Sequence, residues 1–208
     1  MSENKKVDYS RLMFEELESL EMEGRRPKML LHLCCAPCSS YVIEQLNAHF
    51  DLKLYFYDPN IHPREEYVRR KEEAKEHAKK QGIEFFEGAY DVERWYELTT
   101  GHEDDPEKGK RCSLCYDMRL HESARFAREI KCDYFTTVLS ISPHKDAKRI
   151  NETGFSLSRE FGIKYLPADF KKKEGFKKSL ELSRKYSFYR QDYCGCEFSQ
   201  KARARHQD

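Results

Sequence analysis

Short apolar runs alternate with helix-like segments along this chain, and that alternation constrains its fold more than any other feature. Five runs are expected to form strands, at residues 29–33, 52–57, 83–86, 134–139 and 163–166. The segments between and after them are expected to be helical, at 39–49, 63–81, 91–98, 113–131, 145–161 and 174–187. Strands joined by helices pair in parallel through right-handed crossovers, with helices on both faces. The pattern predicts a three-layer, doubly wound α/β fold with a mostly parallel sheet.

The chain has 208 residues, a length that suits one domain with a short appendage. We expect a single α/β catalytic domain at 28–208, which includes a basic C-terminal segment. Residues 1–27 are expected to form an N-terminal helical extension. Its helix should span 8–23, where apolar residues recur at helical spacing, and should end at Gly24 and Pro27.

The N-terminal residues lack the apolar stretch of a secretory signal, and no run of 18 or more apolar residues could span a membrane. We therefore expect a cytoplasmic protein without a membrane partner, in which thiols stay reduced. Charged residues make up 36% of the chain and include many Lys and Glu, as is typical of proteins from thermophiles. Intracellular disulfides do occur in such organisms, so a disulfide bond stays open.

Eight cysteines in a chain of this kind indicate metal or redox chemistry rather than a disulfide framework. Seven of them lie in three short motifs, which are Cys34-Cys35 with Cys38, Cys112 with Cys115, and Cys194 with Cys196. The eighth, Cys132, stands alone at a helix-to-strand junction and is expected to pack as a small apolar group. The first two motifs lie at predicted helix N-termini, which lower the pKa of a thiol.

The expected fold brings distant motifs together, because ligands of such sheets lie outside the carboxyl ends of the strands. The segments after the first, second and fourth strands, CCAPCSS, YDPNIHP and SISPHK, should meet at that edge. Six or seven thiols exceed what one zinc ion needs, and adjacent cysteines suit a compact tetrahedral site poorly. An iron–sulfur cluster is favoured, while zinc and a thiol–disulfide device remain open. No G-x-G-x-x-G or P-loop motif is present.

The C-terminal quarter is basic although the whole chain has a formal charge of only +1. Residues 171–205 carry eleven Lys or Arg against four Asp or Glu. Aromatic residues interleave with these cations, namely Phe170, Phe176, Tyr186, Phe188, Tyr189 and Tyr193. The segment is either a surface for a polyanion or a solvated helix face. It leads directly into Cys194.

Several motifs, in order along the chain, resemble those of the epoxyqueuosine reductases of the QueH type. They are LLHLCCAPCSSY, YFYDPNIHPREEYVRRKEEAK, RCSLCYDMRL, SISPHKD and YRQDYCGCEFS, and the resemblance covers about residues 28–199. It implies a Rossmann-like fold of the adenine-nucleotide α-hydrolase type. It also implies a [4Fe-4S] cluster, with a further iron or a redox-active cysteine pair nearby. The implied activity is the last step of queuosine formation in tRNA, in which an epoxide is reduced to a cyclopentene.

The resemblance also assigns roles to the cysteines. Four of them are the implied cluster ligands, namely Cys34, Cys35, Cys112 and Cys115. Cys194 and Cys196 are implied as a redox pair or as ligands of a second metal, and Cys38 is undecided. The implied partner is the anticodon loop of a tRNA, and the electron donor is unknown.

Opening the epoxide needs two electrons, two protons and a group that assists the departing oxygen. An iron with an open position or a protonated side chain could assist. Asp58 and Asp117 are the favoured side chains, and the others within or beside the motifs are His62, His144 and Asp192.

Two other functions remain open. One is a sulfur transferase for tRNA on the same fold, which would need an S-G-G-x-D-S-like loop where this chain has CCAPCSS. The other is a zinc-stabilised RNA-binding module without catalysis.

Overall fold

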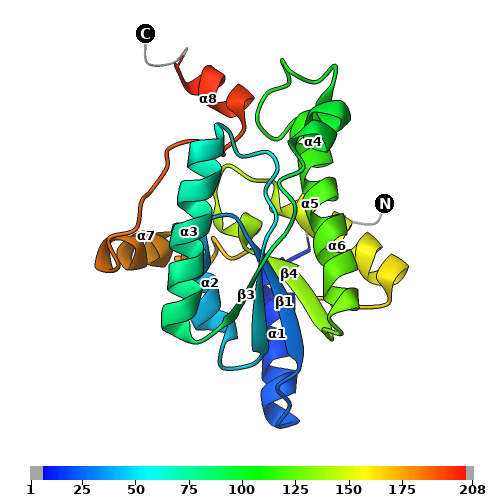
Figure 1. Ribbon diagram of the computed structural model, residues 1–208. Coiled ribbons are helices and arrows are strands. Elements are labelled where there is room, and N and C mark those ends of the chain that lie inside the picture. The colour runs from blue at the N-terminus through cyan, green and yellow to red at the C-terminus, as the bar shows by residue number, and fades with distance from the viewer. Residues whose placement is uncertain (1–6, 205–208) are drawn as a thin grey trace.

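The computed structural model describes residues 7–204, and a five-stranded parallel sheet forms its centre (Figure 1). The strands are β1 (Lys28–Leu33), β2 (Asp51–Phe56), β3 (Glu84–Glu87), β4 (Tyr134–Thr137) and β5 (Lys164–Tyr165). Their order is β3-β2-β1-β4-β5, and every neighbouring pair is parallel. The parallel sheet predicted from the alternation of segments is confirmed.

Helices cover both faces of the sheet, as the sequence predicts. They are α1 (Tyr9–Met22), α2 (Ala36–Leu46), α3 (Arg64–Gln81), α4 (Val92–Thr99), α5 (Lys110–Glu129), α6 (Ala147–Phe161), α7 (Gly175–Lys185) and α8 (Glu197–Ala204). Helices α5 and α6 pack together on one face, and α2 lies on the other face with α3 and α7 beside it (Figure 1). Among residues 7–204, no helix is long and apolar enough to cross a membrane.

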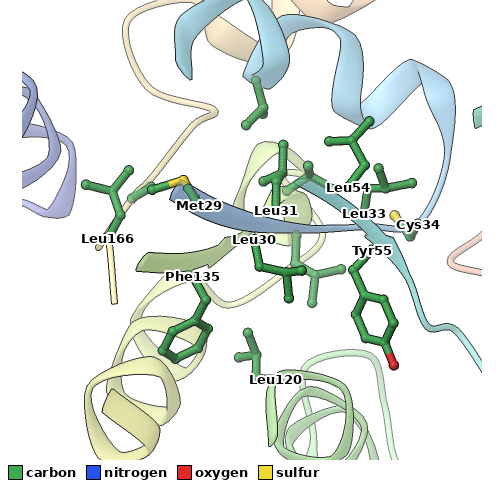
Figure 2. Close-up of a cluster of buried hydrophobic side chains, with 14 of the residues drawn as sticks. Met29, Leu30, Leu31, Leu33, Cys34, Leu54, Tyr55, Leu120, Phe135 and Leu166 are labelled. Carbon is green, nitrogen blue, oxygen red and sulfur yellow. The ribbon is translucent and has the colours of Figure 1, made fainter. Parts of the chain in front are cut away.

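The core consists of side chains that alternate between the two faces of the central strands. Leu30 and Phe135 point toward Leu120 of α5, whereas Leu31 and Leu54 point toward α2 (Figure 2). Both faces of β1 are therefore buried, which explains why its sequence is an almost continuous apolar run.

Helix α1 belongs to the same packed core as the sheet. Its Met13, Leu17 and Leu20 are buried in the main hydrophobic cluster, and Glu16 accepts a hydrogen bond from Tyr134 of β4. The Asp8 side chain caps the helix by accepting from two backbone amides. The predicted helix is thus present, while the domain boundary at residue 27 stays a prediction.

Several predicted bounds shift by one to three residues, and two elements differ in kind from the sequence prediction. Strand β4 ends at Thr137 rather than residue 139, and a 3-10 helix, η1, follows at Val138–Ile141. The Thr137 hydroxyl accepts a hydrogen bond from the Leu139 amide, which turns the backbone away from the sheet. Helix α8 was not predicted, because 197–204 follows a loop and is a short, mostly polar segment.

The direction of strand order reverses between β1 and β4, and ligands bind at such a switch point beyond the carboxyl ends of the strands. The buried ring of His32 joins three strand ends at this edge. Its Nδ1 lies 2.8 Å from Thr137 Oγ1, and its Nε2 lies 3.2 Å from the carbonyl oxygen of Tyr57. With Nε2–H as donor and Nδ1 as acceptor, the ring holds the ends of β1, β2 and β4 together.

Helix α7 approaches α2 closely at Gly175, and this contact predicts a sensitive position. A Cβ atom at Gly175 would lie 1.8 Å from the Phe170 carbonyl oxygen and 2.8 Å from a ring carbon of Tyr41. We expect Gly175→Ala to lower the free energy of unfolding by about 1–3 kcal/mol, because the backbone must move to admit the methyl group. Urea unfolding measures it, and Lys177→Ala, an exposed change in the same helix, is the control. Equal stability of the Gly175 variant and the wild type would contradict the close packing.

Candidate metal centre

Three cysteines lie together where β1 ends and α2 begins. The sulfur atoms of Cys34, Cys35 and Cys38 all lie within 4.8 Å of one another, and we call this group the cysteine triad. Helix α2 begins at Ala36, three residues before its predicted start, with Pro37 in its first turn. Cys38 therefore faces the same point as the two adjacent cysteines, from inside the first helical turn. The sequence left the role of Cys38 undecided, and the fold places its sulfur beside those of Cys34 and Cys35.

Four other cysteines line one small cavity, and we call them the cysteine quartet: Cys112, Cys115, Cys194 and Cys196. The first two lie in the first two turns of α5, where residues three apart share one face of a helix. Asn60, Trp95, Arg111 and Tyr116 complete the lining. The cavity has a volume of about 20 Å³, which is room for a single water molecule. All eight cysteines are free thiols, and Cys132 is buried in the hydrophobic core, as predicted.

The loop after β2 holds the C-x-C segment in place. The His62 amide donates to the Gly195 carbonyl over 2.8 Å, and the Tyr193 hydroxyl donates to the His62 carbonyl over 2.9 Å. Gly195 has a φ of 126°, and a Cβ there would lie 3.0 Å from Ile61 Cγ1. Glycine is needed at this position both for the backbone conformation and for the close approach.

Ser199, at the start of α8, forms hydrogen bonds with both cysteines of the C-x-C segment. Its Oγ accepts from the Cys194 amide over 3.2 Å and donates to Glu107 over 2.8 Å. Its own amide donates to Cys196 Sγ over 3.4 Å. Sequence reasoning missed Ser199, because nothing local marks it and its partners come from distant segments.

Buried cations surround the thiols, and the sequence did not single them out. Arg119 of α5 forms a buried ion pair with Asp58 and places Nη1 4.0 Å from Cys115 Sγ. Arg70 of α3 pairs with Glu66 over 2.6 Å and donates to the Cys194 carbonyl oxygen over 3.2 Å. On a charged helix these arginines look like surface residues, and only their buried positions reveal them.

The surroundings shift the pKa values of several of these groups. Burial raises the pKa of Asp58 to about 7, although the Arg119 guanidinium opposes the shift. Burial also raises the pKa of Cys35, but hydrogen bonds from Cys34 and Cys38 outweigh it and hold that pKa well below its usual value. The cysteine triad therefore favours a thiolate at Cys35, the form in which cysteine binds metals.

The candidate proton donors lie in different surroundings. Asp58 is fully buried beside Arg119. Asp117 faces α6, where Arg149 donates to one carboxylate oxygen and Thr153 donates to the other. Asp117 thus links α5 to α6, and its catalytic role stays a prediction.

The other three candidates lie nearer the surface. The half-buried His62 ring packs against Trp95, with ring centres 5.3 Å apart, and burial lowers its pKa. His144 is exposed. Asp192 is also exposed and forms an ion pair with Arg203 over 3.2 Å. Their roles as proton donors likewise stay predictions.

The basic C-terminal segment presents its cations to solvent. Exposed Lys and Arg side chains are Lys172, Lys173, Lys177, Lys178, Arg184, Lys185, Arg190, Lys201 and Arg203. Of the interleaved aromatic residues, Phe170 is buried and Tyr186 exposed, while the rest are half-buried. Tyr189 is covered by the Arg69 guanidinium, 3.3 Å from its ring centre. The cations are thus more accessible than most of the rings.

The buried Asp58–Arg119 pair predicts a large loss of stability when one partner is neutralised. Asp58→Asn keeps the size of the side chain but leaves Arg119 without a counter-charge. We expect a loss of about 3–5 kcal/mol in metal-free protein above about pH 7, where the wild-type Asp58 is ionised, and a smaller loss below it. Urea unfolding measures it. The same change in the exposed pair, Asp192→Asn, should cost less than about 1 kcal/mol. Adding Arg119→Met to Asp58→Asn should restore part of the loss, and a further, additive loss would contradict the coupling.

Comparison with known proteins gives the family. The family model described as epoxyqueuosine reductase QueH matches residues 29–202. The epoxyqueuosine reductase QueH of Streptococcus pyogenes serotype M1 is 41% identical over 207 residues, which cover 97% of this chain and 81% of that protein. The protein of the same name from Staphylococcus epidermidis is 39% identical over 204 residues, which cover 94% and 86%.

A solved structure shares the fold. It is the U34-tRNA thiolase NcsA from Methanococcus maripaludis with its [4Fe-4S] cluster, which has a TM-score of 0.51 and is 14% identical. The similarity covers 92% of this chain and 71% of that one, and it agrees with the expected adenine-nucleotide α-hydrolase type of fold. The family match and the identity to the two curated relatives extend over nearly the whole chain. The chain therefore belongs to the epoxyqueuosine reductase QueH family.

Proposed function

We propose that this protein reduces the epoxide of epoxyqueuosine in tRNA to the alkene of queuosine. The epoxide takes up two electrons and two protons, both C–O bonds break, a C=C bond forms, and the oxygen leaves as water. The observation that carries the proposal is the gathering of seven thiols at the carboxyl edge of the sheet in a chain of this family. The electrons would come from a strong one-electron reductant whose identity is open.

The donor set fits an iron–sulfur cluster. All seven groups are thiols, and the buried cations beside them suit the negative charge of thiolate-bound iron and sulfide. Our proposed ligands of a [4Fe-4S] cluster are Cys34, Cys35, Cys112 and Cys115. The position of Cys38 within the cysteine triad makes it an alternative ligand. When bound, such a cluster transfers single electrons.

Cys194 and Cys196 are proposed to hold a further iron or to act as a redox pair. Either arrangement would provide a second place for an electron, which a two-electron reaction requires. The hydrogen bonds of Ser199 and His62 fix the segment that carries both sulfurs.

Proton delivery is assigned to this chain's carboxyl groups. Asp58 is the first candidate, because its burial raises its pKa to about 7 and lets it hold a proton near neutral pH. Asp117 is the second candidate, although its present partners are Arg149 and Thr153.

The tRNA is proposed to lie along α7 with its anticodon loop at the thiols. The exposed cations of the basic segment would bind phosphates, and residues 186–193 lead from α7 to Cys194. A tRNA substrate and reduced thiols are both consistent with a cytoplasmic location.

The activity is tested with tRNA that contains epoxyqueuosine. Purified protein, kept under anaerobic conditions with a strong reductant, should convert the modified nucleoside to queuosine, as mass analysis of tRNA digests measures. Unchanged epoxyqueuosine in the presence of loaded protein would overturn the proposal. A reaction that consumes ATP would favour the sulfur transferase instead. A colourless protein with one zinc and no acid-labile sulfide would favour the RNA-binding module.

Cysteine variants separate the two proposed centres. Cys112→Ser should lose the visible absorbance and most of the iron, because it removes a cluster ligand. Cys196→Ser should keep the absorbance but stop turnover. Cys132→Ser, at a buried cysteine in the core, is the control and should keep both. Normal turnover in the Cys196 variant would exclude an essential role for that thiol.

Neutral substitutions in α7 test the proposed tRNA surface. The triple variant Lys177→Gln, Lys178→Gln and Arg184→Gln should bind tRNA more weakly. Its affinity should also depend less steeply on salt, because fewer counterions are released. The matched control changes Lys75, Lys79 and Lys80 to Gln, since these exposed residues lie in the half of α3 far from the carboxyl edge. Equal losses in both triple variants would argue against a specific surface.

A further inference from the structure

Lys145 differs from the buried cations Arg119 and Arg70 in the group that it pairs with. Arg119 is paired with Asp58, and Arg70 is paired with Glu66. The half-buried Lys145 instead places Nζ 2.8 Å from Cys194 Sγ, and it also lies over the ring of Tyr116, 5.9 Å from the ring centre. Among the described residues, no carboxylate forms an ion pair with it. The closest partner of its ammonium group is the sulfur atom of Cys194.

The backbone around Lys145 fixes this position. The residue follows η1 at the carboxyl end of β4, and its amide donates to the Ser142 carbonyl oxygen over 3.3 Å. The next residue, Asp146, caps α6 by accepting from the amides of Lys148 and Arg149. A turn on one side and a helix cap on the other leave the side chain little freedom to approach the centre in another way.

The charge of Lys145 acts on both groups of thiols. Besides Cys194 of the cysteine quartet, its ammonium group interacts electrostatically with Cys34 of the cysteine triad. Arg119 is a second cation near it and repels it. Asp58 balances the charge of Arg119, whereas within the part of the chain that the structure describes no carboxylate forms an ion pair with Lys145. A positive charge held partly away from solvent is unfavourable unless an anion lies beside it. The arrangement therefore suits a centre that carries negative charge.

We propose that Lys145 is a positioning residue whose positive charge compensates the negative charge of the sulfur-bound metal centre and raises its reduction potential. The proposal rests on the proposed function, because it needs a metal centre at these thiols. Reduction adds negative charge to the centre. A fixed cation that donates a hydrogen bond to Cys194 beside the centre stabilises the reduced form more than the oxidised form.

The test is a redox titration of anaerobically reconstituted protein, followed by visible absorbance. Lys145→Gln removes the charge and should shift the midpoint potential to a more negative value than in the wild type. Lys145→Arg keeps the charge and should remain closer to the wild type. Lys148→Gln is the matched control, since this exposed lysine pairs with Glu152 over 3.8 Å and should leave the potential unchanged. Iron and sulfide contents are measured for every variant.

The outcomes separate this proposal from the proposed function. A wild-type protein that takes up no iron and sulfide would overturn both. A Lys145→Gln variant with full iron content and an unchanged potential would overturn the role of Lys145 alone. Should Lys145→Gln fail to hold the centre, Lys145→Arg decides: retention of the centre supports the need for charge, and an equal failure overturns it.

Discussion

The buried ion pair between Asp58 and Arg119 joins parts of the fold on which the whole centre depends. Asp58 lies in the loop that follows β2, whereas Arg119 belongs to helix α5, which precedes β4. Through this pair, the loop that holds Gly195 is connected to the helix that carries Cys115. Both side chains are almost fully buried, so a charge left here on one of them without the other would be strongly destabilising. The pair thus couples the position of the C-x-C segment to that of the C-x-x-C helix.

Charge gives the site its chemical character. Thiols are weak acids, and burial away from water disfavours their ionised form, the thiolate. Cations at Arg119, Arg70 and Lys145 and the N-terminus of α2 oppose this effect. Burial nevertheless keeps the pKa values of Cys112, Cys115 and Cys196 above their usual range. A site built in this way is suited to sulfur ligands and to a bound group of negative charge. The exposed cations of α7 extend positive charge to the surface, where a nucleic acid would approach.

Most of the fold could be predicted from sequence because periodicity is a local property. The five strands and seven of the helices appear where apolar spacing placed them. The prediction failed where a local pattern competes with a specific contact. Thr137 ends β4 early through its own hydroxyl, and α8 is fixed by contacts such as that of Phe198 with Trp95 rather than by periodicity. Asp117 was a candidate because it is close in sequence to Cys115, yet its side chain faces α6.

The sequence by itself determined the alternation of strands and helices, the supply of thiols and the family motifs. Each of these is a property of the order of residues along the chain, and none depends on how the chain folds. Only the tertiary structure decided that the thiols form a group of three and a group of four, with Cys38 in the first. It also decided that Lys145 meets Cys194, 49 residues further along the chain. Such contacts depend on which strand ends meet at the sheet edge and on the direction of each side chain, and local sequence patterns contain neither.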